Sequence, residues 1–281
     1  MLEPENLRRN VATARILVVR DETRFERPDR LATEEPMEIQ AAGPGQDPVS
    51  VAVTMRTPGN DFELAVGFLW TEGLLRSPAD LVSVKYCEVP AEEQHYNVVT
   101  VRLSRPFALE TVQRNFYATS SCGVCGKASL DQVHVQCAGV APGPIVSRTV
   151  LLELPDALRR AQRVFEQTGG LHASGLFDPD GRVVAVREDV GRHNAVDKLV
   201  GMAVLGKEVP LSNNVLMVSG RVSFEIVQKA AMAGIPIVCA VSAPSSLAVE
   251  AAQDLGVTVV GFLRGRGFNV YSHSERIAPD A

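Results

Sequence analysis

The second half of the chain alternates short apolar runs with segments of helical spacing. Nearly continuous apolar runs occupy residues 215–218, 237–241 and 258–260, a pattern typical of strands that helices cover on both faces. We expect strands over residues 182–187, 214–219, 236–242 and 257–263, and helices over residues 192–205, 224–233 and 246–255. A further helix is expected to begin at Pro155 and to end at Gly169 and Gly170. Strands alternating with helices predict βαβ units and a largely parallel sheet.

The first half has a different pattern, typical of an α+β unit. Strands are expected over residues 15–20, 51–56, 81–89 and 96–103. A helix is expected to begin at Asn60, where Asn60 and Glu63 match a capping box, and to end near Gly73. We therefore divide the chain into an N-terminal α+β subdomain, residues 1–115, and a larger α/β domain, residues 116–281.

Composition and charge exclude several classes of protein. The chain has 281 residues, of which 46% are hydrophobic, so it can bury a sizeable core. Its net charge of −5 argues against general nucleic-acid binding. No run approaches the ~20 apolar residues of a membrane span, and the acidic N-terminus does not match a secretory signal. We expect a cytoplasmic protein without a disulfide framework, because its five cysteines are odd in number and Cys87, Cys137 and Cys239 are scattered.

Polar loops follow four of the expected strands, at residues 188–194, 219–223, 242–246 and 264–267. The carboxyl ends of parallel strands share one edge of a sheet, where α/β proteins bind ligands. Glycine amides, helix N-termini and arginines suit an anionic or nucleotide-like ligand. Any one such loop, or either histidine, also has an ordinary structural explanation, but four loops at one edge favour a binding crevice. The sharpest candidate is Arg264-Gly265-Arg266-Gly267, and weaker candidates are His172, His193, Ser219, Gly220, Arg221 and Ser242.

The segment Cys122-Gly123-Val124-Cys125-Gly126 is the strongest candidate for chemistry. Glycines leave the two thiols accessible, and nearby Lys127 favours the reactive thiolate. Three chemistries use this spacing: a zinc site, which needs a second ligand pair that the sequence lacks; a thioredoxin-like disulfide, which is expected within a βαβ unit; and sulfur carriage on a persulfide. The residue types alone leave these alternatives open, together with a loop of no special chemistry.

The surrounding motifs resemble those of the formate dehydrogenase accessory sulfurtransferases, the FdhD family. The resemblance extends in order over nearly the whole chain, and together its motifs are highly specific. They lie at residues 60–69, 72–73, 122–126, 168–174, 188–198, 219–221, 234–236, 242–248 and 261–267.

The resemblance implies a sulfur carrier. Cys122 would hold sulfur from a cysteine desulfurase as a persulfide, and Cys125 would assist. The acceptor would be the molybdenum (or tungsten) bis(molybdopterin guanine dinucleotide) cofactor that formate dehydrogenase needs. The segment Phe262, Leu263, Arg264, Gly265, Arg266 and Gly267 would contact this cofactor.

The resemblance also implies a homodimer and a cytidine deaminase-like three-layer α/β/α domain beside the smaller α+β subdomain. No structural metal is expected, because the sequence lacks a second ligand pair. Deamination itself is not expected, because His172-Ala173-Ser174 lacks the glutamate of a zinc deaminase and the cysteine pair precedes the histidine. Two other functions stay open: a chaperone that binds and inserts the cofactor without transferring sulfur, and a dithiol oxidoreductase.

Overall fold

The computed structural model describes residues 10–87, 94–107 and 139–279. Cys122, Cys125 and Lys127 therefore lie outside the described residues. The fold is mixed α/β, with a six-stranded sheet, a four-stranded sheet and a two-stranded hairpin. No helix of the described part is long and apolar enough to cross a membrane.

The larger sheet has the strand order β12-β11-β10-β9-β7-β8. Its strands are β7 (His172–Phe177), β8 (Val183–Asp189), β9 (Val215–Val218), β10 (Ile237–Ala240), β11 (Thr258–Arg264) and β12 (Gly267–Ser272). Only the β9–β10 and β10–β11 pairings are parallel in this sheet as described, so the prediction of a largely parallel sheet is wrong. Two antiparallel strands went unpredicted: β7 opens with small and polar residues, and β12 directly follows a segment interpreted as a loop. Nevertheless, β8 to β11 all run in one direction, so their carboxyl ends do share one edge.

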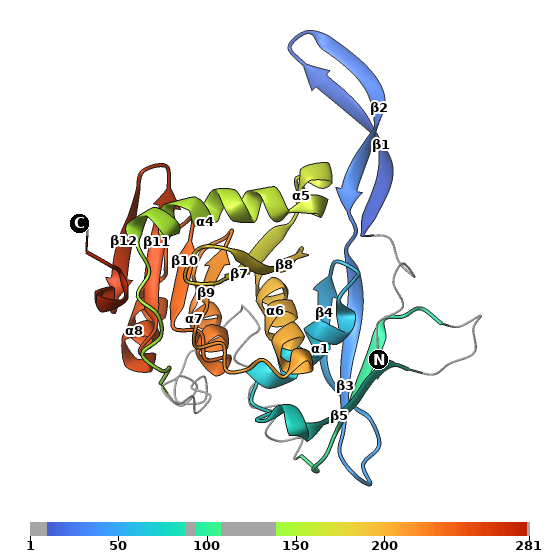
Figure 1. Ribbon diagram of the computed structural model, residues 1–281. Helices are drawn as coiled ribbons and strands as arrows, with labels where there is room; N and C mark the ends of the chain where they lie inside the picture. The colour runs from blue at the N-terminus through green and yellow to red at the C-terminus, as the bar shows by residue number, and fades with distance from the viewer. Residues whose placement is uncertain (1–9, 88–93, 108–138, 280–281) are drawn as a thin grey trace.

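Helices cover both faces of this sheet (Figure 1). Alternate strand residues divide between two cores: Met217 and Cys239 pack with Leu154 of α4 (Arg148–Ala161), whereas Leu216 and Val238 face the opposite side. The opposite face is covered by α6 (Arg192–Gly206), α7 (Phe224–Met232) and α8 (Ser246–Leu255), close to their predicted bounds. This packing gives three layers.

Helix α4 does not begin where the sequence predicts. Ser147 caps it by accepting a hydrogen bond from the Val150 amide at 3.2 Å, and Pro155 lies inside the helix. Gln162 separates α4 from the short helix α5 (Arg163–Thr168). A proline is tolerated best in the first turn, which is why the sequence placed the start at Pro155, but here the helix has two turns before it.

The four-stranded sheet has the order β4-β3-β6-β5. Its strands are β3 (Glu35–Ala42), β4 (Val49–Arg56), β5 (Leu81–Tyr86) and β6 (Val98–Leu103), and short 3₁₀ turns lie at Pro78–Asp80 and Ser274–Arg276. Helix α1 (Asp61–Thr71) joins this sheet to the larger unit by crossing α6. A Cβ at Gly67 would lie 1.8 Å from the Asp197 carbonyl oxygen, and one at Gly201 equally close to that of Glu63. The helices can cross this tightly only because both positions are glycine.

The start of α1 differs from the predicted capping box. Asn60 has a left-handed backbone (φ 59°), and its side chain makes no capping hydrogen bond. Glu63 instead binds the Arg187 guanidinium through two hydrogen bonds of 2.5 and 2.7 Å. The Glu63 carboxylate therefore binds a residue distant in sequence instead of the backbone amide at the helix start, which the local pattern predicted.

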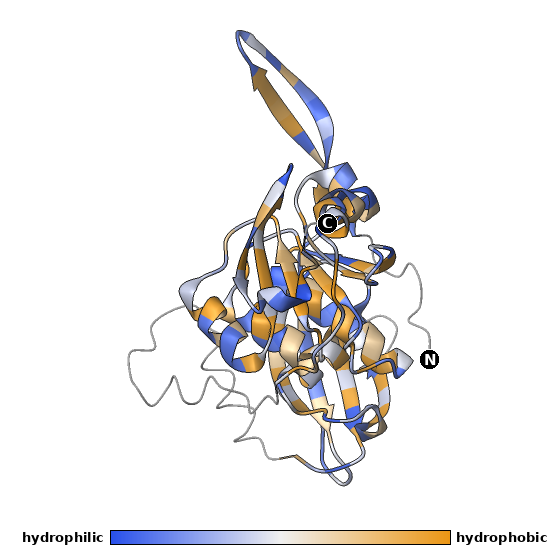
Figure 2. Cartoon of the chain, turned by 60° about the vertical axis from the view of Figure 1, so that its left-hand side comes forward, coloured by the Kyte–Doolittle hydropathy of each residue, from blue (hydrophilic) through white to orange (hydrophobic). Residues whose placement is uncertain are grey.

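A hairpin of β1 (Val11–Arg20) and β2 (Thr23–Ala32) projects from the body of the molecule (Figures 1 and 2). The sequence predicted only part of its first strand and missed its second. Leu17, Val19 and Phe25 are exposed along it. Its base is anchored by a 3.0 Å hydrogen bond from Arg30 to Gln167 of α5.

Candidate functional site

Loops at the carboxyl edge of the larger sheet are joined by hydrogen bonds into one continuous rim. This rim connects the start of β7 with the loops that follow β9 and β10 and with the end of β11. The bonds run from the Ser219 amide to the Ala173 carbonyl (2.9 Å), from the Val222 amide to the Ala243 carbonyl (3.2 Å), from the Ser245 amide to the Val222 carbonyl (3.0 Å) and from the Phe262 amide to the Ser242 carbonyl (3.1 Å). The structure thus brings together loops that lie far apart in sequence, as the sequence predicts.

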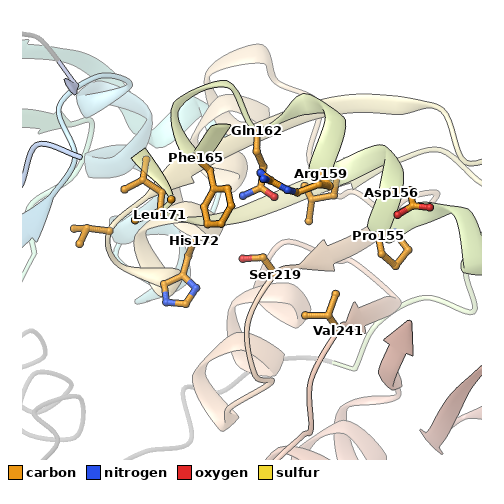
Figure 3. A pocket seen from close by; sticks show the side chains of 13 residues that line it. Pro155, Asp156, Arg159, Gln162, Phe165, Leu171, His172, Ser219 and Val241 are labelled. Carbon is orange, nitrogen blue, oxygen red and sulfur yellow. The ribbon is translucent and has the colours of Figure 1, made fainter. Parts of the chain in front are cut away.

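A pocket of about 640 Å³ lies between this edge and helices α4 and α5 (Figure 3). His172 and Ser219 line it from the sheet, and Arg159 and Phe165 line it from the helices. The Arg159 guanidinium lies 4.2 Å from the centroid of the Phe165 ring. A cation stacked on an aromatic ring beside a polar sheet edge suits a flat, anionic ligand.

The two candidate histidines are held in their neutral forms. His193 Nε2 lies 3.1 Å from Ser223 Oγ and 3.8 Å from a carboxylate oxygen of Glu225. Burial, helped by the positive charge of Arg192, lowers the pKa of His193 to about 4. The same two causes lower the pKa of His172. At neutral pH both imidazoles therefore remain able to accept a proton.

The segment from Phe262 to Gly267 forms the end of β11 and a tight turn into β12. Phe262 has a left-handed backbone (φ 53°), which is strained for a bulky residue, and the Arg264 guanidinium lies 5.8 Å from its ring centroid. The turn residues Gly265 and Arg266 are exposed, and the Arg266 carbonyl accepts a 2.9 Å hydrogen bond from Arg148. Leu263 is buried in the core beneath α4, so its side chain faces away from any ligand.

These arginines do not line the pocket. They lie farther along the same edge, beyond Ser242, with exposed guanidinium groups. Gly220 sits close to His172: a Cβ there would lie 3.5 Å from His172 Nδ1. Arg221 is exposed on the loop between β9 and α7.

The sequence interpretation included Arg192 in the 188–194 loop without naming it as a site residue, and it missed Arg159 and Phe165 as site residues. Arg192 stands in the first turn of α6, and its buried Nε atom has no hydrogen-bond partner among the described residues. Arg192 directly follows Gly191 at the expected start of a helix, on the edge that is expected to bind a ligand, and this position could have identified it from the sequence. Arg159 and Phe165 gave no such signal, because only the bend between α4 and α5 brings them over the sheet edge.

Two charged residues of the 188–198 motif, Asp189 and Lys198, are buried and structural. Asp189 accepts an ion-paired hydrogen bond from Lys198 at 2.7 Å and another from the Thr57 amide at 3.1 Å. Lys198 also donates to the Thr57 carbonyl at 2.9 Å. These contacts fasten the β4–α1 connection to the larger unit.

Across the described residues, no group of three or more histidine, cysteine or acidic side chains is placed to hold a metal ion. Cys87 is half-buried and Cys239 fully buried, and burial raises the pKa of the Cys239 thiol far above its ordinary value. Cys239 therefore does not resemble a reactive thiolate in an exposed loop.

Comparison with known proteins agrees with the motifs. The model of the FdhD/NarQ family matches residues 32–278. The chain is 52% identical to the sulfur carrier protein FdhD of Streptomyces coelicolor over 94% of both chains. It is 44% identical to the protein of that name from Sulfurisphaera tokodaii, over 95% of this chain and 99% of the relative.

A solved structure has the same fold. It is a protein from Desulfotalea psychrophila, provisionally named a formate dehydrogenase accessory protein, with a TM-score of 0.73 and 25% identity. The match covers 96% of this chain and 100% of that one. On the extent of these matches, the chain belongs to the FdhD/NarQ family.

Proposed function

We propose that this protein is a sulfurtransferase that carries sulfur as a persulfide on Cys122. The donor is a cysteine desulfurase, and the acceptor is the molybdenum or tungsten bis(molybdopterin guanine dinucleotide) cofactor destined for formate dehydrogenase. The observation that carries the proposal is identity of 44–52% with proteins named sulfur carriers over nine-tenths or more of this chain. The cysteine pair at positions 122 and 125 supplies the matching chemistry.

The first step is a thiol exchange. The Cys122 thiolate attacks the terminal sulfur of the desulfurase persulfide, a sulfur–sulfur bond breaks, and the desulfurase cysteine leaves as a thiolate. Cys122 then carries the extra sulfur. Lys127 stabilises the attacking thiolate by its positive charge.

The second step delivers the sulfur. The Cys125 thiolate attacks Cys122 Sγ, the terminal sulfur leaves as sulfide for the metal, and a Cys122–Cys125 disulfide forms. A cellular thiol reductant returns both cysteines to thiols, and the two electrons for that step come from the reductant.

The crevice at the sheet edge holds the acceptor by its nucleotide ends. Helices α6, α7 and α8 begin at this edge, where helix N-termini attract phosphate. Exposed Arg264 and Arg266 can form paired hydrogen bonds with phosphate oxygens. The three layers around the larger sheet support the proposal of a cytidine deaminase-like fold for this unit, of which deamination is not a part.

The proposal includes a cytoplasmic homodimer. Sulfur carriage by Cys122 is tested by mass spectrometry of the Cys122 peptide after incubation with a cysteine desulfurase and free cysteine. We expect one added sulfur on Cys122 that a reductant removes, and no such adduct on half-buried Cys87. A peptide without added sulfur would contradict sulfur carriage.

Two variants separate the proposal from a chaperone that only binds the cofactor. Cys122→Ala and Arg264→Ala should each abolish formate dehydrogenase activity in cells, because transfer needs both the thiol and the binding edge. A chaperone would lose activity only with Arg264→Ala. A dithiol oxidoreductase would also show a reversible Cys122–Cys125 disulfide, but it would reduce unrelated substrates and would carry no added sulfur on Cys122.

A further inference from the structure

We infer that Arg192, His172 and His193 form a proton-coupled binding site for a phosphate-type oxyanion, which takes up protons as the anion binds. The identity of the natural ligand, a phosphate group of a nucleotide-bearing cofactor, rests on the proposed function. Binding of a simple oxyanion does not.

His172 and Arg192 meet at one point of the rim from different elements, and His193 follows Arg192 on the same helix, within electrostatic reach of both. His172 begins β7, and Arg192 and His193 occupy the first turn of α6. Gly220 lies between two of them, because a Cβ there would be 3.5 Å from His172 Nδ1 and 3.7 Å from Arg192 Cδ. The absence of a side chain at Gly220 leaves the space above the rim open.

Arg192 is the cation of the cluster, and its hydrogen bonding is incomplete. Its Nε atom is buried without a hydrogen-bond partner in the described part of the chain, a condition that is unfavourable because the donor has lost its contact with water. The N-cap of α6 is Gly191, which has no side chain with which to cap the helix. An oxyanion would satisfy both an arginine donor and the positive helix end.

The groups around the histidines explain why they are neutral without a ligand. His193 faces Arg192 on its own helix, Glu225 and Lys229 on α7, and His172 on β7. His172 faces Arg192 on α6 and Asp189 at the end of β8. Burial and the arginine outweigh the nearby carboxylates and lower the pKa of both histidines.

A bound oxyanion reverses this balance. Its negative charge offsets that of Arg192 and favours the imidazolium form of each histidine, which raises both pKa values. A protonated histidine is a better donor to the anion than a neutral one. Anion binding and proton uptake therefore strengthen each other, and affinity rises as the pH falls through the window between the raised pKa of each histidine in the complex and its lower pKa in the free protein, which for His193 is about 4.

The test is an NMR titration of protein with ¹³C-labelled histidine, with and without sodium sulfate. Sulfate is the probe because it does not titrate between pH 4 and 8, so any proton taken up belongs to the protein. We expect sulfate to move the titration midpoint of His193 upward by about one pH unit or more, and that of His172 in the same direction. His273, which lies 3.1 Å from both Glu275 and the Gln253 carbonyl, is the internal control and should not move.

Two charge-matched variants locate the effect. Arg192→Gln should weaken sulfate binding tenfold or more, raise the His193 midpoint in the free protein and remove the response to sulfate. Arg160→Gln, at an exposed position of α4 outside the pocket lining, removes the same charge and should change affinity less than twofold.

Calorimetry at pH 4.5, between the two expected midpoints of His193, in two buffers of different ionisation enthalpy should give net proton uptake on sulfate binding. The inference is overturned if the histidine midpoints ignore sulfate, or if Arg192→Gln responds like the unmodified protein. The titration is repeated on Cys122→Ala, which should respond to sulfate like the unmodified protein. Failure of the persulfide assay would therefore leave the anion response intact, and loss of the anion response would leave the persulfide assay intact.

Discussion

Helix α6 carries charged residues in two regions that differ in hydrogen bonding: its inner, buried side and its N-terminal end. On the inner side, Lys198 binds Asp189, and Asp197 binds Lys229 at 2.9 Å, all of them buried. At the N-terminal end, Arg192 has an unpartnered Nε and His193 has a pKa of about 4. Both regions come from one motif, residues 188–198. The difference shows that the completeness of hydrogen bonding, rather than polarity, separates residues that fasten the fold from residues available to a ligand.

The inner side is a network shared by several elements. Asp197 also accepts a 2.8 Å hydrogen bond from Thr71 of α1, and Lys229 lies 3.7 Å from a carboxylate oxygen of Glu72. Burial raises the pKa of Asp197 and of Glu72 despite the neighbouring lysine. Such a network tolerates little change, because each member leaves an unpaired partner when it is removed.

The largest expected effect comes from breaking the inner side. Lys198→Ala leaves the Asp189 carboxylate buried without its ion pair, and loss of one partner of a buried pair costs about 3–5 kcal/mol. Urea unfolding should show that loss. Arg182→Ala, at an exposed pair with Asp180, is the control and should cost less than about 1 kcal/mol. If both variants lost the same free energy of unfolding, the buried ion pair would contribute no more to stability than the exposed one.

The helix crossing gives the next largest effect. Gly201→Ala places a Cβ against the backbone of α1, so the helices must separate and the variant should lose about 1–3 kcal/mol or more of stability. Gly206→Ala, at the other end of the same helix, meets only the Glu208 side chain at 3.5 Å and should be neutral or slightly stabilising. A stable Gly201→Ala variant would show that the crossing has room.

The N-terminal end of α6 should make the stability of the protein depend on pH. Because the pKa of His193 is about 4 in the folded protein and about 6.5 in an unfolded chain, the folded state binds fewer protons between these values. Stability is therefore lost as the pH falls through this window. Across this window, His193→Gln should lose roughly 1–2 kcal/mol less stability than the unmodified protein. The difference is smaller than the full pKa shift would give, because His193 is partly exposed to solvent.

Thermal unfolding at pH 7 and at pH 4.5 measures this difference, and His273→Gln provides the matched control. The raised pKa values of Asp197 and Glu72 act with the opposite sign but are present in every variant, so they cancel. Parallel pH profiles for His193→Gln and the unmodified protein would show that His193 titrates normally.

The sequence predicted the edge of the sheet better than the sheet itself. Apolar runs revealed β9, β10 and β11, because strands buried on both faces need them. Strand β7 escaped notice because Ala173, Ser174 and Gly175 are too small to form a pattern. The four loops still meet as predicted, because the two missed strands run antiparallel and leave the direction of the others unchanged.

Contacts between distant residues limited the prediction of the site. Glu63 matched a capping box but binds Arg187, and Leu263 belongs to a binding motif but fills the core. Each outcome depends on tertiary packing that no local spacing encodes. The roles of Cys122 and Cys125 remain predictions, since both lie outside the described residues.

The smallest expected effect is the most direct contrast with Lys198. Arg192→Gln removes a cation whose Nε has no partner in the described part of the chain, so folding loses no complete ion pair and avoids a buried unsatisfied donor. Its free energy of unfolding should stay within about 0.5 kcal/mol of the unmodified protein, or rise slightly. Urea unfolding without added salt checks this, because a bound anion would stabilise only the unmodified protein. If Arg192→Gln proved as destabilising as Lys198→Ala, Arg192 would be a structural residue like Lys198, and the motif would have one role rather than two.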